Sequence, residues 1–335
     1  RVWKEFNQKE NELSGENRET SRQDVQKPEE VSDTPLEPDI EVPVKQAEPQ
    51  IDKTGAVNFH ITDDDLGIGT AKEKFRRNVE AIRTLEKIES ERRIATPEEQ
   101  EILSQYVGWG GLADAFDESK SAWSNEYQEL KGLLSDQEYA SARESTLNAH
   151  YTSPAIIRSI YDALDKMGFE KGNVLEPAMG IGNFFGMLPE KMQESRLYGV
   201  ELDGITGRIA KQLYPNADIK ITGFEKTDYP NDFFDVAIGN VPFGQYKVAD
   251  KQYDKQNFLI HDYFFAKTLD KVRPGGVVAF VTSKGTMDKK SPEVRKYLAQ
   301  RAELLGAVRL PNTAFKENAG TAVTSDILFL KNESQ

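Results

Sequence analysis

The chain changes its hydrophobic period once, near residue 150. Before that point apolar residues recur every three to four positions, which is the spacing of one face of an amphipathic helix. A stretch with this spacing starts after Thr70, which forms a capping-box pattern with Glu73, and a second helix start with proline in its first turn follows Thr96. Residues 66–147 are therefore predicted to form a small helical unit. Its first apolar stripe consists of Phe75, Val79, Ile82, Leu85 and Ile88, and later helices are expected over 124–134 and 136–143.

After residue 150, short apolar runs alternate with amphipathic helices. This alternation is typical of a mostly parallel sheet with helices on both faces, in which ligands bind at the carboxyl ends of the strands. We expect residues 148–335 to form such an α/β domain. The expected strands are Asn173–Glu176, Arg196–Glu201, Asp218–Thr222, Phe234–Ile238, Val277–Thr282, Leu304–Arg309 and Ser325–Leu330, with helices from Pro154 onward and over Thr206–Tyr214, Phe258–Val272 and Pro292–Ala302.

The leading segment, residues 1–65, shows no sustained period. Glu, Gln, Lys, Ser and Pro dominate it, so it is predicted to be a disordered acidic linker or tail. It carries 17 acidic and 8 basic side chains, a balance of −9, whereas the rest of the chain has a balance of −4. Because most of the acidity lies in this segment, the remainder can still present a basic face to a nucleic acid.

Composition removes several classes of site. The chain has no cysteine and only three histidines, so we expect no disulfide and no metal site. No apolar run approaches the roughly 20 residues of a membrane span, and no signal-peptide pattern is present. We therefore expect a cytoplasmic protein, encoded by a bacterium or a phage, without a membrane partner. The first residue is Arg1 rather than methionine, which favours a fragment of a longer protein.

The first chemical motif runs from Glu176 through Pro177, Ala178 and Gly180 to Gly182. It follows an apolar strand and opens a helix, and its glycines let the backbone approach a ligand closely. It lacks the third glycine of the dinucleotide fingerprint and begins with an acid, which favours a ligand with a charged amino acid end. The next strand ends at Glu201, whose carboxylate can accept hydrogen bonds from ribose hydroxyls. That acid suits NAD and S-adenosylmethionine equally.

The third motif favours amino methylation. A buried strand ends in Asn240-Val241-Pro242-Phe243. The Asn240 side-chain oxygen and the Val241 carbonyl can both accept hydrogen bonds from an exocyclic amine, and Phe243 can stack on the base that carries it. A base inside a duplex is out of reach, so it must be flipped out. The alternative is a structural Asn-x-Pro turn with a phenylalanine in the core.

These motifs, in this order, resemble those of the N6-adenine DNA methyltransferases. Glu176 to Gly182 resembles their first motif, Glu201 the acidic second, and Phe224-Glu225 the third, which contacts the adenine of the cofactor. Asn240 to Phe243 resembles the catalytic Asn-Pro-Pro-Phe/Tyr, and His150 to Pro154 is similar to the segment that closes over the methionine end. The resemblance implies S-adenosylmethionine as the cofactor, bound by Tyr151, Thr152, Glu176, Pro177, Ala178, Gly180, Gly182, Asn183, Phe184, Glu201, Phe224, Glu225 and Asn240.

The same resemblance implies a fold and a reaction. The fold would be the Rossmann-like, seven-stranded class I methyltransferase sheet, with one antiparallel strand and helices on both faces, preceded by the helical unit. The reaction would be methyl transfer to the exocyclic amine of an adenine flipped out of DNA, with Asn240, Val241, Pro242 and Phe243 as the catalytic residues.

A narrower resemblance includes the helical unit. Val107-Gly108-Trp109-Gly110-Gly111-Leu112, followed by the Tyr151 segment and Gly239 to Gly244, resembles the methylase portion of large helicase–methylase proteins. Phages and conjugative elements carry those proteins. This resemblance implies that a helicase region of the same full-length protein is a partner of this chain.

Two departures from the family keep alternatives open. Val241 stands where the wider family has proline, and almost nothing follows the last strand, where a target-recognition domain usually lies. The polar segment 245–257 is a candidate lid or DNA-contacting loop. The alternatives are a protein glutamine or RNA adenine methyltransferase, a catalytically weak cofactor-binding or DNA-binding module in anti-restriction or DNA transfer, and, third, an NAD-dependent oxidoreductase.

Overall fold

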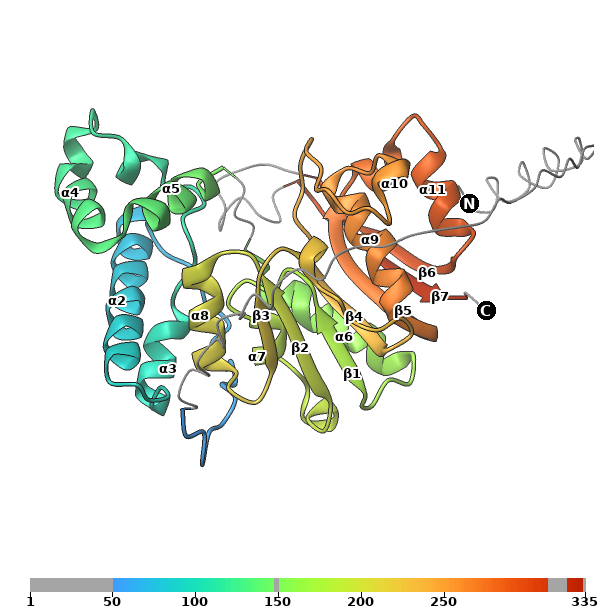
Figure 1. The fold of residues 1–335 in the computed structure, drawn as a ribbon, viewed down its shortest axis with the longest axis horizontal. Coiled ribbons are helices and arrows are strands. Elements are labelled where there is room, and N and C mark those ends of the chain that lie inside the picture. Colours follow the sequence, from blue (N-terminus) through green and yellow to red (C-terminus); the bar gives the residue numbers. More distant parts are fainter. Residues whose placement is uncertain (1–50, 148–150, 313–323, 334–335) are drawn as a thin grey trace, which may run out of the picture. The chain divides into compact units, whose positions relative to one another are not determined.

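The computed structural model of the chain describes residues 51–147, 151–312 and 324–333. In these ranges seven strands join one sheet in the order β3-β2-β1-β4-β5-β7-β6 (Figure 1). All seven were expected from the sequence, and β5 is longer than the expected 277–282. The strands are β1 (Asn173–Glu176), β2 (Arg196–Glu201), β3 (Asp218–Ile221), β4 (Phe234–Asn240), β5 (Val272–Ser283), β6 (Ala302–Arg309) and β7 (Ser325–Asn332).

The strand directions place the three motifs at one edge of the sheet. β3, β2, β1, β4 and β5 are parallel, whereas β7 is antiparallel to both of its neighbours. Glu176 at the end of β1 pairs with Gly199 of β2, and Asn240 at the end of β4 pairs with Val281 of β5. The carboxyl ends of β1, β2 and β4 therefore lie side by side. The sheet order and the single antiparallel strand confirm the predicted fold class.

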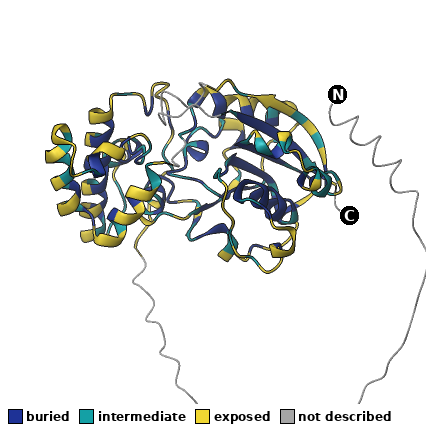
Figure 2. Ribbon diagram, turned by 90° about the horizontal axis from the view of Figure 1, so that it is seen from above, coloured by how far each residue is buried: buried dark blue, intermediate teal, exposed yellow. Residues whose placement is uncertain are grey.

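The sheet separates two apolar cores because successive strand residues point to opposite faces. Val174 and Val236 pack in one core, whereas their neighbours Leu175 and Ala237 pack in the other. Helices α6 (Pro154–Lys166), α7 (Asn183–Gly186) and α8 (Gly204–Leu213) cover the first face, and α9 (Ile260–Lys271) and α11 (Glu293–Ala299) cover the second. Figure 2 shows the buried strands between helices with exposed outer faces.

The helical unit has the elements that the sequence predicts. Its helices are α2 (Ala71–Ser90), α3 (Pro97–Ser104), α4 (Ser124–Leu133) and α5 (Asp136–Ser145). The capping boxes of Thr70 with Glu73 and of Thr96 with Glu99 both form. The shorter helical turns along the chain are η1 (Ala113–Phe116), η2 (Ser121–Trp123), η3 (Glu190–Met192), η4 (Phe224–Lys226), η5 (Asp254–Gln256) and α10 (Gly285–Asp288).

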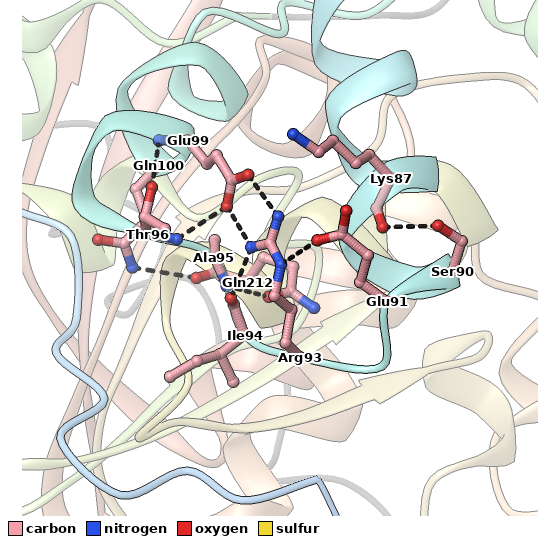
Figure 3. Close-up of polar contacts among 10 residues, drawn as sticks. All are labelled: Lys87, Ser90, Glu91, Arg93, Ile94, Ala95, Thr96, Glu99, Gln100 and Gln212. Carbon is pink, nitrogen blue, oxygen red and sulfur yellow. Dashed lines mark hydrogen bonds and ion pairs between the residues drawn. The ribbon is translucent and has the colours of Figure 1, made fainter.

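The helical unit packs against α8 of the α/β domain. Arg208 of α8 pairs with Glu89 of α2 at 2.9 Å and with Glu138 of α5 at 3.0 Å. Around the start of α3, Ala95 N donates to Gln212 Oε1 at 2.9 Å (Figure 3). Arg93 beside it pairs with Glu99, which lowers the pKa of Glu99 to about 2.

Part of the segment predicted to be a tail, residues 51–65, lies within the described structure and bonds to the α/β domain. The tail was expected to extend to residue 65, but Phe59 N donates to Leu213 O and Ile61 N to Gly186 O, both at 2.8 Å, and Ile61 is buried. Apolar residues at 57, 59 and 61 alternate with polar ones, a pattern that indicates folded structure. The strongly polar composition of the preceding residues made this short pattern hard to recognise. Residues 1–50, the rest of the predicted tail, lie outside the described residues.

Candidate functional site

One cavity of about 410 Å³ lies at the carboxyl ends of β1, β2 and β4. The three sequence motifs all contribute to its wall. Two of the expected residues do not line it, Gly182 and Phe243, and His150 lies outside the described residues. The expected residues that line it are Tyr151, Thr152, Glu176, Pro177, Ala178, Gly180, Asn183, Phe184, Glu201, Phe224, Glu225, Asn240, Val241 and Pro242.

The glycine turn after β1 is closed by a backbone hydrogen bond. Gly182 N donates to Met179 O at 2.9 Å, and the turn places Gly180 and Gly182 at φ +57° and +91°, where glycine is favoured. A Cβ on Gly182 would lie 2.5 Å from the ring of Tyr214, so this glycine is required for packing. A Cβ on Gly180 would meet open space, because this residue forms part of the cavity wall.

Two acids lie close together at this edge. Glu201 at the end of β2 accepts from Gly180 N at 2.8 Å and from Asp203 N at 2.9 Å, and burial raises the pKa of Glu201 to about 7. Glu176 is only 2% exposed, and its Oε2 has no hydrogen-bond partner among the described residues. Burial, and then the neighbouring Glu201, raise the pKa of Glu176 well above its usual value.

Asn240 lines the cavity, and the two ends of its amide differ in their hydrogen bonds. Its Nδ2 donates to Thr152 Oγ1 at 3.1 Å. Its Oδ1 is buried and has no hydrogen-bond partner within the described ranges. Such an acceptor loses its hydrogen bonds to water without replacement, which is unfavourable unless a ligand supplies a donor. A residue of the cavity wall therefore holds a buried acceptor that the described part of the protein does not satisfy.

Val241 is held by a bond that proline could not form. Its N–H donates to Val281 O at 3.1 Å, so the β4–β5 ladder continues one residue beyond Asn240. Its side chain is buried in the core that contains α9. The rigidity that the family obtains from proline is replaced here by a backbone hydrogen bond and by packing.

Phe243 does not reach the cavity. Its ring is half-buried and contacts both apolar cores. Sequence analysis also missed apolar residues of the cavity wall, among them Leu202, Ile260 and Phe264. Phe224 lies against Phe264 of α9 with ring centroids 5.0 Å apart, and Leu202 is 75% exposed beside Glu201. Ile260 and Phe264 lie four residues apart on α9, so they share one face of that helix. This spacing is the sequence signal that could have identified them as part of the wall.

The chemistry of the cavity fits S-adenosylmethionine. Leu202, Phe224 and Phe264 offer apolar surface to an adenine, and Glu201 offers carboxylate oxygens to a ribose. Glu176 has an unpartnered oxygen that suits a positively charged amino acid end. Among the residues that the structure describes, no three acidic or histidine side chains gather closely enough to hold a metal ion. Within the same ranges, every helix is too short or too polar to cross a bilayer.

The sheet order, the single antiparallel strand and a cavity at the ends of β1, β2 and β4 define the class I S-adenosylmethionine-dependent methyltransferases. The sequence model of the family described as N-6 DNA Methylase matches residues 132–335, more than half of the chain. The chain belongs to this family, and S-adenosylmethionine is its cofactor.

The known proteins that are similar to this chain align with different fractions of it. Defense against restriction protein B of Escherichia phage P1 is 28% identical over 242 residues, which are 70% of this chain and 9% of the phage protein. The rRNA N(6)-adenosine-methyltransferase metl-5 of Caenorhabditis elegans is 24% identical over 59% of this chain and 94% of its own length. A class I S-adenosylmethionine-dependent methyltransferase structure from Listeria monocytogenes has a TM-score of 0.47 at 16% identity, covering 78% of this chain and 89% of that one.

Proposed function

We propose that this chain transfers a methyl group to the exocyclic amine of adenine in DNA. The observation that carries the proposal is Asn240, a residue of the cavity wall whose amide nitrogen donates to Thr152 while its buried oxygen has no partner among the described residues. An exocyclic amine is a donor of the right kind for that oxygen. A structural Asn-x-Pro turn would instead have its amide oxygen hydrogen-bonded within the protein.

Two acceptors hold the amine in this mechanism. Asn240 Oδ1 and the carbonyl of Val241 accept its two N–H groups, which directs the nitrogen lone pair away from both oxygens. When bound, S-adenosylmethionine supplies a methyl group that is activated by a positively charged sulfur. Transfer of that methyl group would form an N–C bond as an S–C bond breaks, and the amine nitrogen would release one proton to solvent. The two oxygens stabilise the positive charge that develops on nitrogen, and rigid positioning supplies the rest.

The cofactor is positioned in this proposal by residues of the first two strands. Glu201 accepts from the ribose, and its carboxylate is held by the backbone of Gly180 and Asp203. Glu176 pairs with the amino acid end. Thr152 acts as a positioning residue, because its hydroxyl accepts a hydrogen bond from the Asn240 amide and holds the side chain in place.

The segment after the catalytic motif supplies the contacts to DNA in this proposal. Tyr246 lines the cavity and is 46% exposed, so its ring is available to a base that leaves the duplex. Lys251 and Lys255 are exposed and form no ion pair in the described part of the chain, which leaves them available to phosphates. Phe243 would stack on the base only after a change of side-chain position, since it packs against the cores.

The same proposal includes the longer protein of which this chain is a part. This chain spans 9% of the length of the phage P1 protein, whose name refers to defence against restriction. We infer that the chain is the methylase part of a longer protein of a phage or a conjugative element, with a helicase region as its partner.

RNA adenine is the second candidate, because the rRNA methyltransferase metl-5 aligns with this chain over 94% of its own length. The test offers a labelled methyl donor with duplex DNA, single-stranded DNA, rRNA or protein, and identifies the product by mass spectrometry. We expect N6-methyladenine in DNA, and none with the Asn240→Ala variant. Label in rRNA alone would establish the second candidate. Methylcytosine, or cofactor binding without any transfer, would contradict the proposal, and the latter result would support a binding module.

A further inference from the structure

One wall of the cavity comes from the helical unit. Tyr106, Val107, Gly108 and Trp109, which follow α3, line it together with Ser145 at the end of α5. The match to the methylase family begins at residue 132, so the turn 106–109 lies outside it. No motif of the sequence analysis assigned this turn to the cofactor.

A buried side chain holds the turn in place. Asn78 of α2 donates through Nδ2 to Gly108 O at 2.6 Å and accepts through Oδ1 from Val107 N at 2.9 Å. Asn78 is fully buried. Trp109 packs edge-to-face against Phe75 and Phe116, so the turn is fixed on its far side as well. The wall is therefore preformed rather than a loop that must be ordered.

A chain of contacts connects this turn to Glu201. The buried Tyr106 hydroxyl contacts the side chains of Thr206 and Trp109. Thr206 Oγ1 donates to Asp203 Oδ2 at 2.7 Å, and Asp203 N donates to Glu201 Oε1 at 2.9 Å. The turn therefore lies at the end of the cavity where the acid of β2 is found.

The packing of the helical unit on α8 keeps this geometry rigid. Ser141 of α5 donates to Asp203 Oδ1 at 3.1 Å, and Asp203 lies two residues after Glu201 in the chain. Gln100 of α3 donates to Gln212 O at 3.0 Å, close to the contact of Ala95 with the same glutamine (Figure 3). These contacts attach the unit to α8, the helix that follows Glu201.

The backbone of the turn is open to the cavity. Gly108 has φ +74°, and a Cβ built on it would meet no heavy atom within 4 Å. Its neighbours Val107 and Trp109 present apolar surface to the same space. We propose that the turn 106–109 covers the ribose end of the bound cofactor, so that the helical unit completes the cofactor site instead of reading the target. This rests on the proposed function, in which Glu201 accepts from the ribose.

The first test places a carboxylate in this wall. Val107→Asp is compared with Ile102→Asp in the 335-residue chain, since both positions are apolar, half-buried and outside the two cores, but only Val107 lines the cavity. The dissociation constant of S-adenosylhomocysteine is measured by calorimetry. We expect Val107→Asp to raise it at least about tenfold, because an additional carboxylate in this wall crowds the ribose and competes with Glu201 for its hydroxyls. Ile102→Asp should leave it within about twofold.

The second test uses the fluorescence of the wall itself. The chain has three tryptophans, and Trp109 lines the cavity whereas Trp123 does not. Replacing the other two tryptophans with phenylalanine leaves Trp109 as the only tryptophan and keeps the wall unchanged. The fluorescence of this variant should change and saturate with cofactor concentration, and a constant signal would contradict the inference.

The outcomes separate this inference from the proposed function. If the unmodified chain binds no S-adenosylhomocysteine, the proposed function fails. If it binds normally but Val107→Asp and the Trp109 signal are unaffected, only the inference is overturned. If Val107→Asp weakens DNA binding without changing cofactor affinity, the wall faces the target and the inference is wrong.

Discussion

Two asparagines, one in the helical unit and one at the strand ends, have buried amide oxygens that are used in opposite ways. Asn78 has both ends of its amide hydrogen-bonded to the backbone of the turn 106–109. Asn240 has its nitrogen bonded to Thr152, but its oxygen has no partner within the described ranges. A fully bonded amide connects two parts of the protein, whereas a half-bonded one is prepared for a donor that the protein does not supply.

The same contrast separates the two regions. Gln100 in the helical unit donates to Val57 O and to Gln212 O, and within residues 51–147 every buried side-chain polar atom has a partner. The buried atoms without one, Glu176 Oε2 and Asn240 Oδ1 among them, all lie in the α/β domain. Among the residues that hold these atoms, Glu176 and Asn240 line the cavity, so unused hydrogen-bonding capacity is present at the strand ends and not in the turn 106–109.

The largest expected effect is on Asn240. Replacing it with alanine removes the acceptor for the amine while leaving the cofactor pocket in place. We expect the rate of methyl transfer to fall at least about 100-fold, as for removal of one preorganised transition-state contact. The affinity for S-adenosylhomocysteine should stay within about twofold, because the free oxygen is assigned to the target. Transfer that persists at the original rate would show that this oxygen has no catalytic role.

Asn78→Ala is the corresponding substitution in the helical unit. It leaves Gly108 O and Val107 N without their buried partner, and we expect a loss of about 2–4 kcal/mol in the free energy of unfolding. Urea denaturation measures this loss, with Asn240→Ala as the control that should be far less destabilised. Equal destabilisation of the two variants would remove the distinction between a structural and a functional asparagine.

The smallest expected effect is a pH dependence of cofactor binding. Burial raises the pKa of Glu201 to about 7, so its carboxyl is protonated below that pH and loses acceptor capacity for the ribose. The dissociation constant of S-adenosylhomocysteine should therefore rise as pH falls from about 8 to about 6, by at most about tenfold per pH unit. Glu201→Gln should bind more weakly and abolish this dependence. If the dependence persists in that variant, Glu176 is its source.

Local pattern was sufficient for most of the fold. The seven strands follow from short apolar runs, and two helix starts follow from the capping boxes of Thr70 and Thr96, because burial imposes a fixed period on each element. The neighbouring positions of Glu176, Glu201 and Asn240 were predictable as well, since the carboxyl ends of parallel strands meet at one edge.

Other features depend on residues that are distant in sequence. The orientation of Asn240 requires Thr152, 88 residues earlier, and the bond from Val241 N to Val281 O joins two strands. The position of Phe243 against the cores and the contribution of the turn 106–109 to the cavity also arise from packing. The hydrophobic period of a sequence predicts that a residue is buried, but it does not predict which residues it contacts. The residue types and strand ends of the site were therefore readable from the chain, whereas its free oxygen and its helical wall follow from how the helices and the sheet pack together.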